Sequence, residues 1–76
     1  MSSRPSATGK QTVKALERLG FSVMKSSGSS HQMIGIPGTS TRVPVPVHSA
    51  RDLPLGTLKQ ILRALRIDEK DFYRAL

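Results

Sequence analysis

Two histidines, His31 and His48, are the side chains of this chain best suited to acid–base chemistry. An imidazole whose pKa lies near neutrality can take up or release a proton at physiological pH, so it can serve as a general base or a general acid. The histidines and the five carboxylates show no HExxH-like or other close ligand spacing, and cysteine is absent from the sequence. We therefore expect chemistry that uses neither a metal ion nor another cofactor.

The sequence around each histidine leaves its role open. His31 follows the small polar run SSGSS at positions 26–30 and precedes a Pro37-Gly38 turn. Its spacing alone favours an ordinary polar residue on a solvent-facing strand. His48 ends a Val-Pro-Val segment. It could take part in proton transfer, or it could simply hydrogen-bond the loop that follows.

The charge of the chain indicates the kind of partner. Twelve Lys and Arg residues against five Asp and Glu residues give a formal net charge of +7. Ten of these twelve basic residues are spread from Arg4 to Arg66, so the charge is not collected in a tail. A positive field of this kind attracts polyanions, chiefly nucleic acid, and raises the rate of encounter with them. The alternative is a charged surface that serves only solubility.

Length and hydropathy narrow the class of protein further. Seventy-six residues suffice for one domain with a small core and modest stability. No stretch approaches the roughly 18 apolar residues of a membrane helix, and the polar N-terminus lacks the apolar core of a signal peptide. We expect a cytoplasmic protein that does not contact membranes, with a flexible N-terminus (residues 1–7) and a single domain (residues 8–76).

The first half of the chain predicts a helix followed by three strands. Thr8 is a plausible N-cap, Gly20 a C-cap, and apolar residues recur between them at helical spacing. The segments 21–25, 31–36 and 41–47 are predicted strands, separated by the 26–30 connection and a Pro-Gly turn. Pro44 and Pro46 point their missing amide donors the same way, which favours an edge strand or its end.

The second half predicts two helices. Residues 48–55 read as a loop, Gly56-Thr57 opens a helix with a leucine-rich stripe, and Asp68 could cap a last short helix. Strands adjacent in sequence form an antiparallel meander, with the helices packed on one face. The fold class is therefore α+β. The same element order, α-β-β-β-α(α), occurs in double-stranded-RNA-binding domains.

A series of motifs in the second half of the chain is more specific than the element order. Together, in this order and spacing, it strongly resembles the HicA toxin family. The segment Leu16–Phe21 also resembles the family's first helix where it runs into the first strand, and the resemblance covers about residues 10–72. The motifs are Val45-Pro46-Val47-His48, Asp52-Leu53, Gly56-Thr57-Leu58, Ile61-Leu62-Arg63 and Phe72.

The resemblance implies an endoribonuclease that cleaves mRNA, an mRNA interferase, which inhibits translation and growth and is neutralised by a HicB-type antitoxin protein. It also implies a catalytic histidine at the head of the second strand, and His31 occupies that place. Two positions depart from the family pattern. Ser29-Ser30 stand where Gly-Ser or Gly-Gly is usual, and Arg66 stands where a glycine commonly ends the helix. Arg66 must therefore either avoid a positive φ or bear its strain.

RNA carries its own nucleophile, the 2′-hydroxyl beside the scissile phosphate. Cleavage then needs a base for the hydroxyl proton, charge to offset the phosphorane, and an acid for the leaving oxygen. Amides of the 26–30 loop and the hydroxyls of Ser29 and Ser30 could hold the phosphate. Lys25 and Arg42 are the candidate phosphate contacts from the strands. Both cations could equally be solvated strand charges.

Two rival functions remain at this point. The first is a non-catalytic RNA-binding module with the fold of a double-stranded-RNA-binding domain, in which His31 only contacts the RNA backbone. The second is a DNA-binding regulator that uses the helix around Leu58–Leu65, although no helix–turn–helix pattern is present. The sequence holds only two Phe and one Tyr, which argues against a base-stacking sheet.

Overall fold

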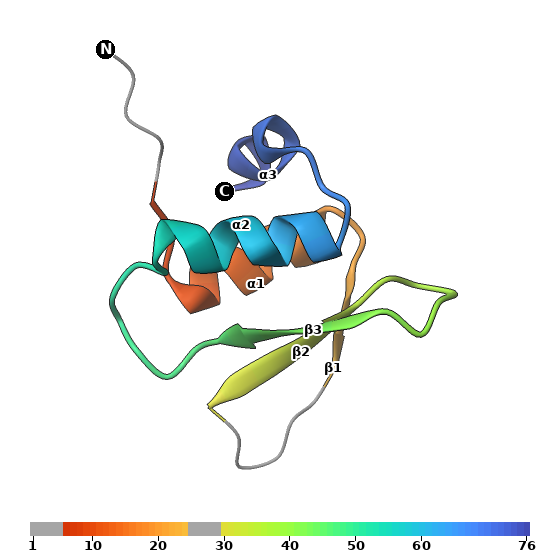
Figure 1. The fold of residues 1–76 in the computed structure, drawn as a ribbon, viewed down its shortest axis with the longest axis horizontal. Helices are drawn as coiled ribbons and strands as arrows, with labels where there is room; N and C mark the ends of the chain where they lie inside the picture. The colour runs from red at the N-terminus through yellow and green to blue at the C-terminus, as the bar shows by residue number, and fades with distance from the viewer. Residues whose placement is uncertain (1–5, 25–29) are drawn as a thin grey trace.

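The computed structural model describes residues 6–24 and 30–76, and shows a three-stranded antiparallel sheet with its helices on one face (Figure 1). The strands lie in the order β1-β2-β3. The predicted α+β class and the element order of a double-stranded-RNA-binding domain are confirmed. None of the helices in the described residues is long and apolar enough to cross a membrane. The elements are α1 (Gly9–Arg18), β1 (Ser22–Met24), β2 (His31–Gly35), β3 (Arg42–Pro46), α2 (Leu55–Ala64) and α3 (Glu69–Ala75).

Helix α1 begins at a complete capping box. The amide of Gln11 donates to Thr8 Oγ1 at 3.1 Å, and the amide of Thr8 donates to Gln11 Oε1 at 2.9 Å. Two of the amides that a helix start leaves unsatisfied are thereby paired. Thr12 is buried, and its hydroxyl donates to the carbonyl of Thr8 at 2.9 Å. The predicted N-cap at Thr8 is confirmed, and α1 presents a buried stripe of small and apolar residues to the sheet.

The middle strand carries the centre of the core. Ile34 of β2 pairs with Val23 of β1 and with Val43 of β3, so the three side chains form one row on the face that the helices cover. Ile34 is fully buried. β2 is one residue shorter and β3 two residues shorter than the sequence predicts; β1 begins one residue later, and the predicted end of that strand, Lys25, lies outside the described residues. Val45 of β3 is also fully buried, and the helical layer contributes the other large core side chains: Leu16, Leu58, Ile61, Leu62, Leu65 and Phe72.

Strand β3 is an edge strand, as its prolines predict. The amide of Val47 donates inward to the carbonyl of Ser30 at 2.9 Å, which extends the β2–β3 ladder by one step. Since amides alternate in direction along a strand, Pro44 and Pro46 fall where an amide would point away from β2. Their missing donors therefore cost the sheet nothing, and the outer edge offers few donors to another strand.

Helices α1 and α2 end in the same hydrogen-bond pattern but with different residues at the left-handed position. After α1, Gly20 donates to Glu17 and Phe21 donates to Leu16; Gly20 has a φ of 97°. After α2, Arg66 donates to Arg63 and Ile67 donates to Leu62. This is the Schellman arrangement, whose left-handed residue is usually glycine. Arg66 has a φ of 58°. Of the two outcomes that the sequence leaves open, it therefore adopts the strained one.

Relieving the backbone strain at Arg66 should increase the stability of the fold. Arg66→Gly should stabilise the fold by about 0.5–1 kcal/mol, because the left-handed penalty of a side chain exceeds the extra entropy that glycine loses on folding. Thermal unfolding followed by circular dichroism should show a rise of about 4 °C.

Gly20→Arg is the matched control, since it makes the reverse change at the same position of the same motif. A Cβ atom at Gly20 would meet no atom of a non-neighbouring residue within 4 Å, so the backbone conformation is what opposes a side chain there. This variant should lose about 1 kcal/mol. A lower melting temperature for Arg66→Gly would contradict the interpretation.

Candidate functional site

The pairing of β2 with β3 brings the two histidines together at one end of the sheet. His31 begins β2 and lies opposite Pro46, the last residue of β3. His48 follows two residues later, and the centroids of the two imidazole rings are 6.3 Å apart, with their planes tilted by 46°. Both side chains are exposed. The sequence left the role of His48 open; the structure makes it a neighbour of His31.

The start of α1 holds the end of β3 and the loop that carries His48. A Cβ atom on Gly9 would lie 1.7 Å from the carbonyl oxygen of Pro46, so only glycine permits this close approach. At the other end of the loop, Leu53 donates its amide to the carbonyl of Ala7 at 2.8 Å, and Thr8 forms an isolated bridge with Asp52. The His48 loop is therefore fixed at both ends by the same short segment.

Of the candidate phosphate ligands, Ser30 lies beside the catalytic candidate. Its Oγ is 3.3 Å from His31 Nδ1, and which atom donates depends on the tautomer of the ring. Ser30 is exposed, so its hydroxyl is also within reach of a ligand. Lys25 and Ser29 lie outside the described residues.

Arg42 lies at the opposite end of β3 from the histidines. It is exposed and pairs with Gly35, four register positions from the His31–Pro46 pair, which is about 13 Å along the strand. Arg42 is thus too far away to share one phosphate with His31. The two side chains nevertheless line the same groove, a hollow of about 430 Å³ between β3 and α2.

One side of α2 forms the second wall of this groove. Thr57, Gln60, Ile61 and Ala64 line it, and their i, i+3, i+4, i+7 spacing places them along one side of the helix. From the sequence, the leucine stripe of α2 predicts core packing, and the only binding role considered for this helix was contact with DNA in the rival regulator. A signal was present, because uncharged polar or small residues recur beside the leucine stripe.

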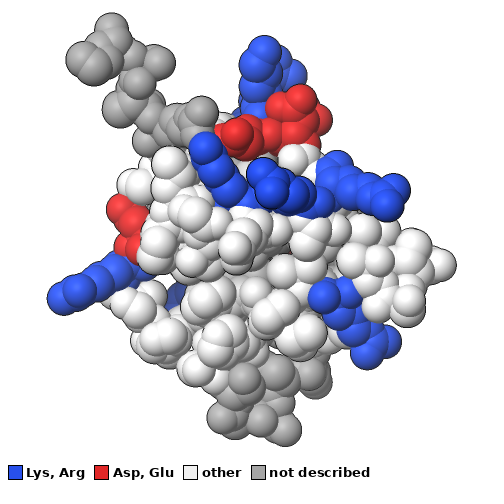
Figure 2. Space-filling model, viewed as in Figure 1, with Lys and Arg blue, Asp and Glu red and all other residues white. Residues whose placement is uncertain are grey.

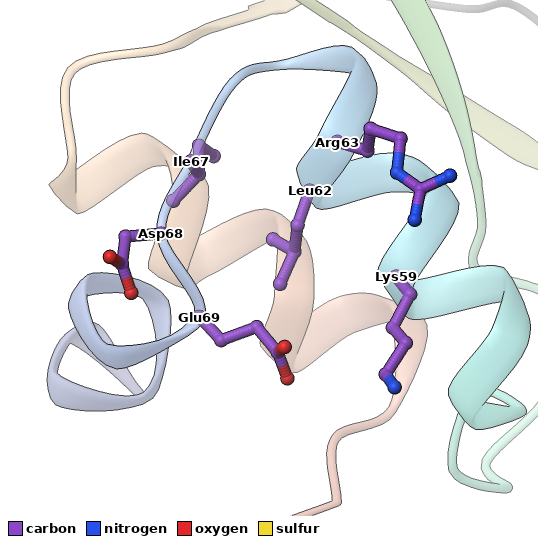
Figure 3. A pocket seen from close by; sticks show the side chains of 6 residues that line it. All are labelled: Lys59, Leu62, Arg63, Ile67, Asp68 and Glu69. Atoms are coloured by element: carbon purple, nitrogen blue, oxygen red, sulfur yellow. The ribbon is translucent and has the colours of Figure 1, made fainter.

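The basic residues of α2 lie on a different side of the helix from the groove. Lys59 and Arg63 line a separate cavity of about 390 Å³ with Asp68, the N-cap of α3, and Glu69, its first residue (Figure 3). Figure 2 shows basic side chains gathered along the upper edge of this face, with acidic ones beside them. The positive field is therefore uneven, and part of it is offset locally by carboxylates.

The described part of the chain contains no group of three or more His, Cys, Asp or Glu side chains that could hold a metal ion. The titratable side chains beside the groove are an imidazole pair and one guanidinium. Such a set can move protons and attract an anion.

A family model described as the HicA toxin of bacterial toxin–antitoxin systems matches residues 9–67. The chain belongs to the HicA toxin family. The match runs from the first residue of α1 to just beyond α2, so it includes both histidines, Arg42 and both walls of the groove. A search of curated proteins found no match. The family resemblance inferred from the motifs is confirmed, and with it the membership of a toxin–antitoxin system.

The proximity of the two imidazole rings in this HicA-family protein can be tested without any assay of activity. At a centroid separation of 6.3 Å, protons of the His31 and His48 rings should show a nuclear Overhauser effect in solution. His31→Ala should shift the ring resonances of His48, whereas Arg63→Ala, on α2, should leave them in place. Ring resonances of His48 that do not respond to His31→Ala would show that the two side chains are apart.

Proposed function

We propose that this chain is an endoribonuclease toxin that cleaves mRNA without a metal ion, with His31 as its catalytic residue. The observation that supports this most strongly is the pair of exposed imidazoles with ring centroids 6.3 Å apart. Cleavage through the 2′-hydroxyl needs a base and an acid on opposite sides of one phosphorus atom. Two imidazoles at this separation can contact both oxygens. The cytoplasm, which holds translated mRNA, is the proposed place of action.

The reaction divides between the two histidines as follows. One imidazole takes the proton of the 2′-hydroxyl while the 2′-oxygen attacks phosphorus. The bond from phosphorus to the 5′-oxygen breaks, and the other imidazole, in its protonated form, gives that oxygen a proton. The products are a 2′,3′-cyclic phosphate and a 5′-hydroxyl. Ser30, beside His31, can donate its hydroxyl to a phosphate oxygen.

The cations have separate tasks in this proposal. Arg42 lies about 13 Å along the strand from His31, so it contacts a neighbouring phosphate and positions the RNA. Lys25 and Ser29 are proposed from the sequence as ligands of the scissile phosphate. A non-catalytic RNA-binding module would use the same positive charge. It would not need two imidazoles held side by side at the end of the sheet.

Removing either imidazole should separate chemistry from binding. His31→Ala should abolish cleavage of a labelled transcript, and His48→Ala should slow it by about 10²–10⁴-fold, the usual contribution of one acid–base group. Both residues are exposed, so the melting temperature and RNA affinity should change little. Lys59→Ala, on the far side of α2, is the control with retained activity. Parental rates in the His31→Ala protein would refute the catalytic assignment.

Because RNA holds the nucleophile, chelation should not affect the reaction. Cleavage in excess EDTA should proceed at the parental rate, and mass spectrometry of the fragments should find 2′,3′-cyclic phosphate ends. Activity that is lost on chelation and restored by magnesium would require a different mechanism.

Membership of a toxin–antitoxin system implies a partner that holds the toxin inactive, and we propose a HicB-type antitoxin with an acidic surface. Such a surface would speed association with a chain of net charge +7 and cover the groove and histidines at once. The partner should therefore displace labelled RNA from the His31→Ala protein in a competition titration. A ternary complex with undiminished RNA affinity would exclude this mode of inhibition.

A further inference from the structure

The groove between β3 and α2 has a composition that phosphate binding does not explain. Among the described residues that line it, the titratable side chains are His31 at one end and Arg42 at the other. Between these ends the walls are apolar or small: Val43, Pro44, Pro46, Ile61 and Ala64. The remaining two residues, Thr57 and Gln60, are polar but uncharged. A phosphate would find no cation in the middle of this groove.

The same composition suits a nucleobase. A base has apolar faces, which can lie against proline rings and aliphatic side chains, and a polar edge that carries hydrogen-bond donors and acceptors. The amide of glutamine has both a donor and an acceptor, and it can pair with such an edge at two points. A groove of about 430 Å³ is within the range of pockets that hold small ligands.

The surface around the groove separates neutral from charged regions. Figure 2 shows a band of uncharged surface below the basic side chains of α2 and over β3, with further basic side chains at its right-hand end. Lys59 and Arg63 line a different cavity with Asp68 and Glu69, on another side of α2. The basic residues therefore border the neutral band without entering it.

From this arrangement we propose that the groove binds one unpaired base of the RNA, in the nucleotide next to the scissile phosphate. The proposal rests on the proposed function, because it takes the phosphate between His31 and His48 as the scissile one. The base lies against Pro44, Pro46 and Ile61, Gln60 reads its edge, and Arg42 contacts the next phosphate along the strand. Adenine is the base whose edge a glutamine amide pairs with best.

A segment of a partner protein is the rival occupant, and the edge of β3 disfavours it. An added strand would need amide donors along that edge to form its ladder. Pro44 and Pro46 have none, and they are two of the three residues of β3 that face outward. Arg42 is then the one outward-facing residue of β3 that keeps an amide donor, which is too few for the ladder of an added strand, while the flat faces of the prolines remain suitable for a base.

The test uses four single-stranded pentaribonucleotides that differ only in the central base. Binding to the His31→Ala protein is measured by fluorescence anisotropy, and cleavage of the same set by the parent protein gives the rates. The oligonucleotide with central adenine should bind about tenfold more tightly than that with uracil. Gln60→Ala should reduce this ratio to about twofold or less. Ala64→Phe, which fills the groove at an exposed position of α2, should weaken binding of all four.

Lys59→Ala is the matched control, since it is exposed and adjacent to Gln60 but lies on the other side of α2. It should leave the affinity ratio among the four oligonucleotides unchanged, and any small loss of affinity from the removed charge should be the same for all four. Circular dichroism establishes that each variant is folded. An unchanged ratio in Gln60→Ala, or no base preference in the parent, would overturn the proposal. If Gln60→Ala lowers the affinity for the antitoxin but leaves the base preference intact, the groove is a docking site for a protein instead.

The two proposals can fail separately. If the parent cleaves all four oligonucleotides equally and Gln60→Ala has no effect, the endoribonuclease assignment stands and the base site is wrong. If adenine is preferred in binding and Gln60→Ala removes that preference, but no oligonucleotide or transcript is ever cleaved, the base site stands and the catalytic assignment is wrong.

Discussion

The site depends on the antiparallel pairing of the first residue of β2 with the last residue of β3. In that register His31 lies opposite Pro46, and the Val47–Ser30 hydrogen bond follows beyond this pair. It brings His31 and His48, which are 17 positions apart in the sequence, to one end of the sheet. A shift of either strand by one residue would turn its own core residue, Ile34 of β2 or Val43 of β3, away from the helices. The buried row through β1, β2 and β3 therefore fixes the register, and the register fixes the separation of the imidazoles. Core packing and the geometry of the site are in this way one constraint.

Helix α1 supports that end of the sheet from outside the ladder. The contact of Gly9 with Pro46, the bridge between Thr8 and Asp52, and the capping box all involve the first residues of this helix. One short segment thus starts a helix and anchors the loop that carries His48. Helix α2 has a comparable double use, because its leucines fill the core while the adjacent side forms the wall of the groove. In so small a domain α1 and α2 each serve both the core and the site.

Much of the fold could be predicted from the sequence because its signals are local. The cap at Thr8, the left-handed Gly20 and the alternating prolines of β3 each need only a few neighbouring residues to interpret. The family motifs placed His31, which remains a proposal as the catalytic residue. The neighbourhood of His48 could not be predicted, because it depends on pairing between strands. The groove was missed because the leucine stripe of α2 explained the helix without it. Whether Arg66 adopts a positive φ could not be decided from residue type, since the backbone conformation depends on how α2 joins α3.

Division of proton transfer between His31 and His48 is tested most directly with an RNA that has sulfur in place of the 5′-oxygen at the scissile bond. A thiolate leaves without protonation, so this substrate needs the general base and does not need the general acid. Cleavage by His31→Ala and by His48→Ala is compared with cleavage by the parent on the sulfur and oxygen substrates. One of the two variants should recover the parental rate on the sulfur substrate, and the other should remain inactive on both. Recovery of both variants, or of neither, would contradict an acid–base pair formed by these two imidazoles.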